Sequence, residues 1–260
     1  MIITKERVPS PHPNIHLYET SYKSGALTVY GLLAEPKCRN KQPGLLYLRG
    51  GIKSVGMVRT QRVIQWAHEG FVVFAPYYRG NRGGEGREDF CGDDRVDAYS
   101  GFDLLSSHPL VEKEAGVHVV GFSRGGIMAL WTGLMRPEAT SIVCWSGVTD
   151  MVLTYKERVD LRRMMKRVIG GTPWKRPELY EKRTPLRHLS DFRPPLLFIH
   201  GEKDEHVSIV HAQKGLRAAK GSQNAESWFF ADFSHHFPAE EQEKVLRKAA
   251  SWMKAKHHSG

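Results

Sequence analysis

A serine lies between two glycines in residues 121–125, Gly-Phe-Ser-Arg-Gly. The apolar residues 117–120 precede this pattern, and residues 127–131 follow it with a helical sequence. A serine on a sharp turn from a strand into a helix is strained, and its hydroxyl points outward. The free N–H groups of the helix N-terminus below it can stabilise an oxyanion. The spacing therefore predicts that Ser123 is a nucleophile for acyl transfer.

A serine hydroxyl needs a base, and the base needs a carboxylate that orients it. The charge-rich residues 200–207 come directly after the apolar strand predicted at 195–200. Loops at the C-terminal ends of parallel strands face the site of an α/β sheet, so we expect Asp204 to be the acid. Glu202 and Glu205 are alternative carboxylates, and Asp204 could instead cap the following helix.

Two adjacent histidines, His235 and His236, follow the last predicted strand. Neighbouring side chains cannot both face one serine, so we expect one histidine to be the base and the other to be peripheral. The resulting chain order of serine, aspartate and histidine is the order found in the α/β-hydrolase fold.

Strands and helices alternate along most of the chain. The predicted strands are residues 15–22, 26–34, 44–48, 71–76, 117–121, 141–145, 195–200 and 226–231. The predicted helices are residues 58–69, 93–106, 126–135, 207–219 and 239–254. The inner strands are continuous apolar runs, as in parallel strands covered on both faces. We expect one α/β domain over residues 1–260, with a mostly parallel central sheet, helices on both faces and a small cap-like helical insertion at about 149–191.

The net charge of +10 is concentrated in that insertion. Residues 151–193 contain twelve Lys and Arg against five Asp and Glu. This pattern is not the basic stripe with interleaved aromatics of a nucleic-acid-binding protein, so no nucleic-acid partner is expected. The excess charge indicates either a solvated helical face or a basic rim that draws acidic or carboxylate-bearing substrates toward a pocket.

The three cysteines, Cys38, Cys91 and Cys144, have no metal-type spacing. We expect reduced, structural thiols in a cytoplasmic protein. Residues 1–6 lack the apolar core of a signal peptide, and no apolar run is long enough to span a bilayer. We therefore expect no membrane partner, and the predicted chemistry needs no metal and no organic cofactor. Exposed edge strands permit a homodimer.

Four separate motifs carry a resemblance to a known family. They are Arg49-Gly50-Gly51, the glycine-rich loop of residues 78–86, the serine motif of residues 121–126, and the pattern His-Gly-x-x-Asp-x-x-Val of residues 200–207. The chain resembles the hydrolase domain of the prolyl-oligopeptidase family of the α/β-hydrolase superfamily, over roughly residues 15–255. We expect a stand-alone hydrolase domain without the β-propeller of the large relatives.

The resemblance implies roles for further residues. The family's His-Gly-Phe ending makes His235 the base, because it stands two places before Phe237, and His236 is the rival. The family pattern also implies an oxyanion hole formed by the backbone N–H of Arg124 and that of Gly51 or its neighbour. Arg49 stands where the family usually has a histidine, which is a departure from its pattern.

The expected activity is that of a serine hydrolase that cleaves carboxylic esters or small amides through an acyl-enzyme. An oligopeptidase or aminopeptidase is the alternative, and it needs an acidic anchor for the substrate amine. The cluster of Glu85, Glu88 and Asp89 is the candidate anchor. A third hypothesis is an inert binding protein with the hydrolase fold.

The insertion offers a candidate acyl pocket. Its large apolar side chains either line this pocket or form the insertion's own small core. These side chains are Met151, Tyr155, Met164, Met165 and Trp174. In either case the expected substrate is a small-molecule ester or a short peptide.

Overall fold

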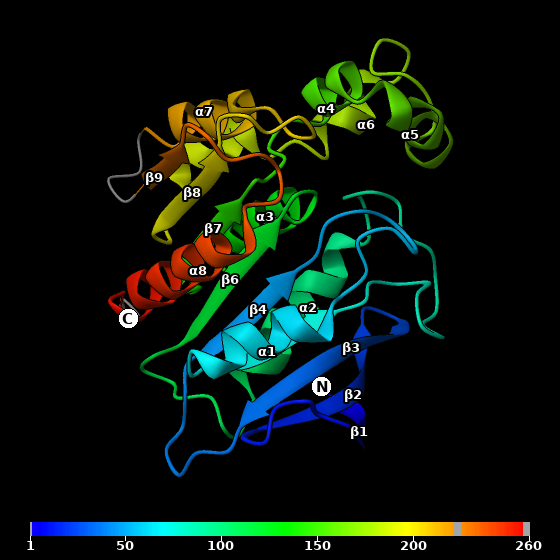
Figure 1. Cartoon of the computed structure of the whole chain (residues 1–260). Coiled ribbons are helices and arrows are strands. Elements are labelled where there is room, and N and C mark those ends of the chain that lie inside the picture. Colours follow the sequence, from blue (N-terminus) through cyan, green and yellow to red (C-terminus); the bar gives the residue numbers. More distant parts are fainter. Residues whose placement is uncertain (1, 221–224, 257–260) are drawn as a thin grey trace.

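The computed structural model describes residues 2–220 and 225–256. Its centre is a nine-stranded sheet in the order β1-β2-β3-β5-β4-β6-β7-β8-β9 (Figure 1). The first three strands are antiparallel, β3 also pairs antiparallel with β5, and all pairs from β5 to β9 are parallel. The sheet is therefore mostly parallel, as the sequence predicts.

The strands have the following bounds. They are β1 Ile2–Val8, β2 Ile15–Ser24, β3 Leu27–Pro36, β4 Gly44–Leu48, β5 Val72–Pro76, β6 Val117–Phe122, β7 Ser141–Trp145, β8 Leu196–Gly201 and β9 Ala225–Phe230. The five central parallel strands, from β5 to β8 in the sheet order, are entirely or almost entirely buried. This burial explains why their sequences are unbroken apolar runs rather than alternating ones.

The helices have the following bounds. They are α1 Thr60–His68, α2 Arg95–Ser106, α3 Gly125–Met135, α4 Met151–Glu157, α5 Arg162–Ile169, α6 Pro177–Glu181, α7 Ile209–Ala218 and α8 Ala239–Lys254. Short 3₁₀ turns, η1 Val159–Leu161 and η2 Leu186–Asp191, complete the segment between β7 and β8. In Figure 1, α4, α5 and α6 gather at one end of the molecule, beyond the sheet.

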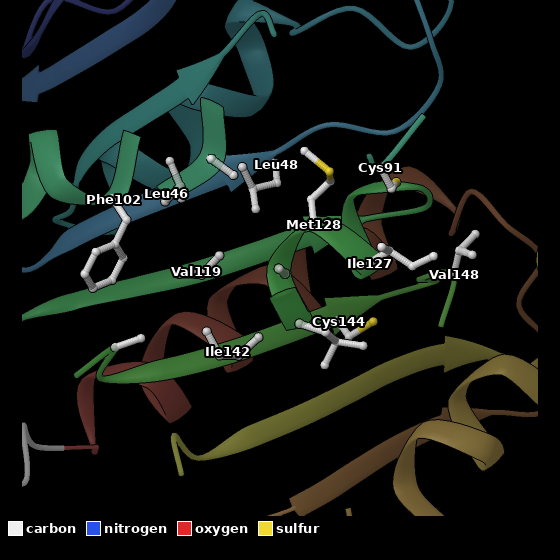
Figure 2. Packing of buried hydrophobic residues seen from close by; sticks show 14 of the residues in the cluster. Leu46, Leu48, Cys91, Phe102, Val119, Ile127, Met128, Ile142, Cys144 and Val148 are labelled. Carbon is white, nitrogen blue, oxygen red and sulfur yellow. The ribbon is translucent and has the colours of Figure 1, made fainter. Parts of the chain in front are cut away.

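Alternate residues of the central strands enter two separate cores. Leu46, Val119 and Ile142 pack with the buried faces of α2 and α3, whereas Leu45 and Val143 pack with those of α1 and α8. Figure 2 shows Ile127 and Met128 of α3 between the strands that carry Leu48 and Cys144. Helices thus cover both faces of the sheet and fix the helix that follows the serine motif.

Strand β1 was not predicted from the sequence. Residues 2–8 are mostly polar and their side chains are largely exposed, so they lack the apolar alternation that marks a strand. Their order comes from backbone pairing with β2 along Thr4 to Val8. Residues 9–13 form part of the short connection between these two strands.

All three cysteines are free thiols, with Cys38 exposed and Cys91 and Cys144 buried. Burial raises the pKa of Cys144 to about 12, so this thiol stays protonated and packs as an apolar side chain. Among the helices that the structure describes, none is long and apolar enough to cross a membrane.

Candidate active site

Ser123 occupies a sharp turn between β6 and α3. Its φ of +56° lies in the left-handed region, which is costly for a side chain other than glycine. Gly125 lets the chain turn here, since a Cβ at this position would lie 2.1 Å from the carbonyl oxygen of Leu48. Backbone bonds from Ser123 N to Trp145 O (3.1 Å) and from Gly126 N to Ser123 O (2.9 Å) hold the turn. The serine thus has the geometry of the predicted nucleophile elbow.

Asp204 follows β8 and forms two kinds of contact. Its Oδ1 accepts hydrogen bonds from the amides of His206 (2.9 Å) and Val207 (2.8 Å), which fix the loop. Its Oδ2 lies 2.8 Å from Nδ1 of His235. The carboxylate therefore orders its own turn and also binds a histidine. The rival carboxylates Glu202 and Glu205 are exposed.

The ionisation of Asp204 depends on these contacts. Burial would raise its pKa, but hydrogen bonds from His200 and His235 outweigh burial and hold the pKa well below the ordinary value. An ionised carboxylate only accepts hydrogen bonds, so Nδ1 of His235 must carry the hydrogen. In the neutral imidazole Nε2 is then free to take a proton.

His200 supports the acid and was not singled out by sequence reasoning. Its Nε2 lies 2.8 Å from the carbonyl oxygen of Val207 and 3.4 Å from Oδ2 of Asp204. Because a carbonyl oxygen only accepts, this nitrogen carries a hydrogen. The sequence feature that could have identified His200 is its position as the last buried side chain of β8, directly before the loop that carries Asp204.

The structure separates the two adjacent histidines. His235 is buried and contacts Asp204, whereas His236 is exposed and stacks on Phe122 at 5.5 Å between ring centroids. Partial burial against the cavity lowers the pKa of His236, and the neighbouring Arg59 charge lowers it further. Of the two, only His235 has the carboxylate contact that the role of base requires.

Ser123 and both histidines line one cavity of about 360 Å³. Gly50 and Gly51, which follow β4, also line it. A Cβ on Gly50 would lie 2.7 Å from Cβ of Ser123, so this turn passes directly over the nucleophile. No hydrogen bond joins Ser123 Oγ to His235 within the part of the chain that the structure describes. In unliganded enzymes this contact commonly tightens only when substrate binds.

The two amides predicted for the oxyanion hole have no partner in the described residues. Gly51 N and Arg124 N donate to no backbone acceptor and to no side chain. Gly51 lines the cavity, and Arg124 directly follows the nucleophile at the start of α3. Both N–H groups are therefore available to a developing negative charge on a bound carbonyl.

The contacts of Arg49 show what this side chain does in place of the family's usual histidine. Its guanidinium donates to the carbonyl oxygens of Gly50 (2.9 Å) and Tyr77 (3.0 Å) and pairs with Glu88 at 3.0 Å. Arg49 is 1% exposed. These hydrogen bonds and this ion pair therefore hold the glycine turn in place over the cavity.

Glu88 is the centre of a buried charged cluster behind the nucleophile. It accepts from Arg49, from Arg124 at 2.7 Å and from the amide of Lys53 at 2.6 Å. Arg124 also pairs with Asp94 at 3.3 Å and lies over the ring of Tyr78. The cluster connects the glycine turn to the residue that follows Ser123, so it fixes both predicted oxyanion donors.

The predicted acidic anchor for a substrate amine is wrong. Glu88 is paired with arginines inside the buried cluster. Asp89 accepts hydrogen bonds from the backbone amides of residues 92–94 and pairs with Arg183. Glu85 accepts the amide of Thr28 at the surface. None of these carboxylates lines the cavity. Sequence reasoning missed this because the arginine partners lie 36 and 39 residues away from Glu88.

The predicted apolar pocket from the insertion is wrong as well. Met151, Tyr155 and Met165 are buried in the main core, and Trp174 is 68% exposed. None of the five proposed side chains lines the cavity, to which the insertion contributes Arg158. Four of the insertion's other cations contact nearby acids or carbonyls within the described residues, as in Arg176–Glu178 and Arg187–Glu181. These pairs agree with a solvated basic face.

The described residues hold no group of three or more His, Cys, Asp or Glu side chains that could bind a metal ion.

Comparison with known proteins decides the family. Residues 58–259 match the sequence profile of the prolyl oligopeptidase family. The chain belongs to this family. It is also 54% identical over 256 residues to the uncharacterized peptidase YtmA of Bacillus subtilis, covering 98% of this chain and 99% of that protein. Membership makes the chain a hydrolase of the serine peptidase type.

Solved structures share the fold. The acylaminoacyl peptidase of Pyrococcus horikoshii superposes with a TM-score of 0.79 at 18% identity, over 96% of this chain and 43% of the peptidase. An esterase of Pyrococcus furiosus superposes with a TM-score of 0.73 at 17% identity, over 96% of this chain and 98% of the esterase. The α/β-hydrolase fold is thereby confirmed, and it is shared by peptidases and esterases alike.

Proposed function

We propose that this family member is an esterase that acts through an acyl-enzyme on Ser123. The observation that carries the proposal is the 2.8 Å contact between His235 and Asp204 beside the strained serine turn. In this assignment Ser123 is the nucleophile, His235 the base and Asp204 the acid that orients it. These three side chains follow the C-terminal ends of β6, β9 and β8, where α/β sheets carry their sites.

The first half of the reaction forms the acyl-enzyme. Oγ of Ser123 attacks the ester carbonyl carbon while its proton passes to Nε2 of His235. The ionised Asp204 stabilises the imidazolium through Nδ1. The amides of Arg124 and Gly51 stabilise the negative charge on the carbonyl oxygen, a contribution of about 10²- to 10³-fold per donor. The carbon–oxygen bond then breaks, and the proton on Nε2 passes to the leaving alkoxide, which departs as an alcohol.

The second half releases the acid. Water attacks the acyl carbon and gives one proton to His235, and the bond to Ser123 Oγ breaks. The serine recovers its proton from the imidazole, and the carboxylic acid leaves. Both halves use the same base and the same oxyanion donors, so no further group is required.

The lining of the cavity favours esters over peptides with a free amino terminus. Of the described residues that line it, none is Asp or Glu, while Arg49, Arg59, Arg62 and Arg158 are all present. A substrate ammonium group would meet no carboxylate and several positive charges, which costs binding energy. An ester carries no such charge and has a better leaving group than an amide.

A second candidate is cleavage of peptides whose amino terminus is acylated. The relative YtmA is named a peptidase, and the fold is shared with an acylaminoacyl peptidase. An acylated terminus has no ammonium charge, so the missing carboxylate does not disfavour it. This candidate needs the same three side chains and the same donors.

The test compares three substrate classes on one preparation. We expect turnover of 4-nitrophenyl acyl esters to exceed that of N-acetyl-aminoacyl anilides, and free aminoacyl anilides to be the poorest. The Ser123→Ala variant is the control that assigns turnover to the site. Faster cleavage of the acylated anilides would favour the second candidate, and ester turnover that survives Ser123→Ala would refute the assignment of the nucleophile.

A further inference from the structure

Five polar side chains on β4, on or next to α1, and on α8 line the cavity and take no part in the proposed reaction. They share the ability to donate hydrogen bonds, and two are cations. They are Tyr47 on β4, Arg59 immediately before α1, Arg62 and Trp66 on α1, and Gln242 on α8. The spacing of 59, 62 and 66 puts Arg59, at the start of α1, on the same side of the helix as Arg62 and Trp66.

The two arginines have no counter-charge in the part of the chain that the structure describes. Neither Arg59 nor Arg62 makes an ion pair or a side-chain hydrogen bond there, although both line the cavity. By contrast, Arg49 pairs with Glu88, and Arg158 pairs with Asp160 at 2.7 Å. Burial and the neighbouring Arg59 charge both lower the pKa of Arg62, as expected for a cation that lacks a partner.

One buried polar group near these cations lacks a partner, and a second lining hydroxyl makes no hydrogen bond within the described residues. Trp66 is 1% exposed, and its indole N–H is buried without a hydrogen-bond acceptor. Tyr47 is 9% exposed, and its hydroxyl makes no hydrogen bond within the described residues. Both side chains line the cavity. A buried donor without an acceptor is unfavourable, so the indole N–H of Trp66 marks a place where a ligand acceptor belongs.

The hydrogen-bond donors in this group of side chains indicate which ligand would bind here. Guanidinium and indole groups donate hydrogen bonds and accept none. A carboxylate only accepts, and arginine binds it with paired, charge-assisted bonds. No Asp or Glu of the described lining competes with such a ligand.

Building on the proposed ester hydrolysis at Ser123, we propose that Arg59, Arg62, Trp66 and Tyr47 form a subsite for a carboxylate on the substrate. The preferred substrates are then esters that carry a negative charge on the acyl chain or on the leaving group. The function of the subsite is selection, since it touches the substrate away from the reacting carbonyl.

The experiment uses two isosteric pairs of substrates. For the acyl side, mono-4-nitrophenyl glutarate is compared with 4-nitrophenyl 5-methylhexanoate, and for the leaving group, 4-carboxyphenyl acetate is compared with 4-acetylphenyl acetate. We expect the wild-type ratio of kcat/KM, anionic over neutral, to exceed unity for at least one pair. In Arg62→Gln that ratio falls about 10- to 100-fold, because a charge-assisted bond is lost.

Matched variants separate a local effect from a general one. Arg62→Lys keeps the charge and retains part of the preference, whereas Arg62→Glu reverses it. Arg217→Gln removes one positive charge from an exposed position on α7, outside the cavity, and leaves the ratio unchanged. Added salt weakens the wild-type preference, because the subsite is partly open to solvent.

Two results overturn the subsite without touching the reaction. One is a wild-type ratio at or below unity for both pairs, and the other is an anionic preference that Arg62→Gln and Arg62→Glu leave intact. In both cases the neutral esters are still hydrolysed in a Ser123-dependent way. Failure of the proposed function is different, because then neither the neutral nor the anionic esters are turned over by the wild-type protein.

Discussion

Replacing Glu88 with glutamine removes the negative charge that Arg49 and Arg124 share. The side chains of Glu88, Arg49 and Arg124 are 1%, 2% and 2% exposed, so water cannot replace the lost partner. Arg124 keeps Asp94 at 3.3 Å, whereas Arg49 is left with carbonyl oxygens alone. The change therefore strands one buried cation completely and weakens the pairing of a second.

The size of the effect follows from burial. Removing one partner of a buried ion pair costs about 3–5 kcal/mol, because an uncompensated charge remains inside the protein. Above pH 7, where Asp94 is ionised, Arg124 retains a counter-charge, so we expect a single cost of this size and not two. For a domain of this length that cost lowers Tm by roughly 6–20 °C, at about 2–4 °C per kcal/mol.

Thermal unfolding measures this cost when the Tm of Glu88→Gln is compared with the Tm of a control variant, Glu243→Gln. Glu243 pairs with Arg247 on the exposed surface of α8, and loss of an exposed pair costs less than about 1 kcal/mol. Turnover of 4-nitrophenyl esters, measured below the unfolding transition, is the second readout of the proposed activity, because Glu88 also binds the amide of Lys53 in the turn after β4. Equal Tm values for the two variants would refute the reasoning that the buried carboxylate holds both arginines in place.

Three further changes test other parts of the site. Asp204→Asn should lower kcat by about 10³- to 10⁴-fold with the fold retained, since His235 loses its orienting carboxylate; a loss below tenfold contradicts this. Gly125→Ala should cost several kcal/mol in urea unfolding, because its Cβ would lie 2.1 Å from Leu48 O. Burial raises the pKa of Asp94 from 3.8 to about 7, so the folded state binds a proton that the unfolded chain has lost. Wild-type stability relative to Asp94→Asn should therefore fall as pH rises from about 5 to 7, by up to about 1.4 kcal/mol per pH unit; a constant difference in urea unfolding would exclude this.

Local patterns were sufficient to locate the sharp turn at Ser123 and the buried parallel strands. The elbow at Ser123 is encoded within six residues, and the buried strands are unbroken apolar runs. Polar β1 was missed because backbone pairing with β2, and not side-chain burial, orders it.

Contacts between side chains that lie far apart in the sequence could not be predicted from local patterns. The choice of His235 over His236 depends on how the turn after β9 directs only one of two neighbouring rings at Asp204. The role of Glu88 depends on arginines from two other segments. The α1 side of the cavity did have a sequence signal, since positions 59, 62 and 66 recur at helical spacing. Tyr47, which also lines the cavity, comes from β4 and has no such signal.

The assignment of Ser123, His235 and Asp204 is tested most directly by the rate at which a fluorophosphonate modifies Ser123, followed by peptide mass spectrometry. We expect the wild type to be labelled at Ser123 and His236→Ala to keep most of that rate. We expect His235→Ala to lose it by several orders of magnitude. Rapid labelling of Ser123 in His235→Ala, or labelling of a different serine in the wild type, would contradict the assignment.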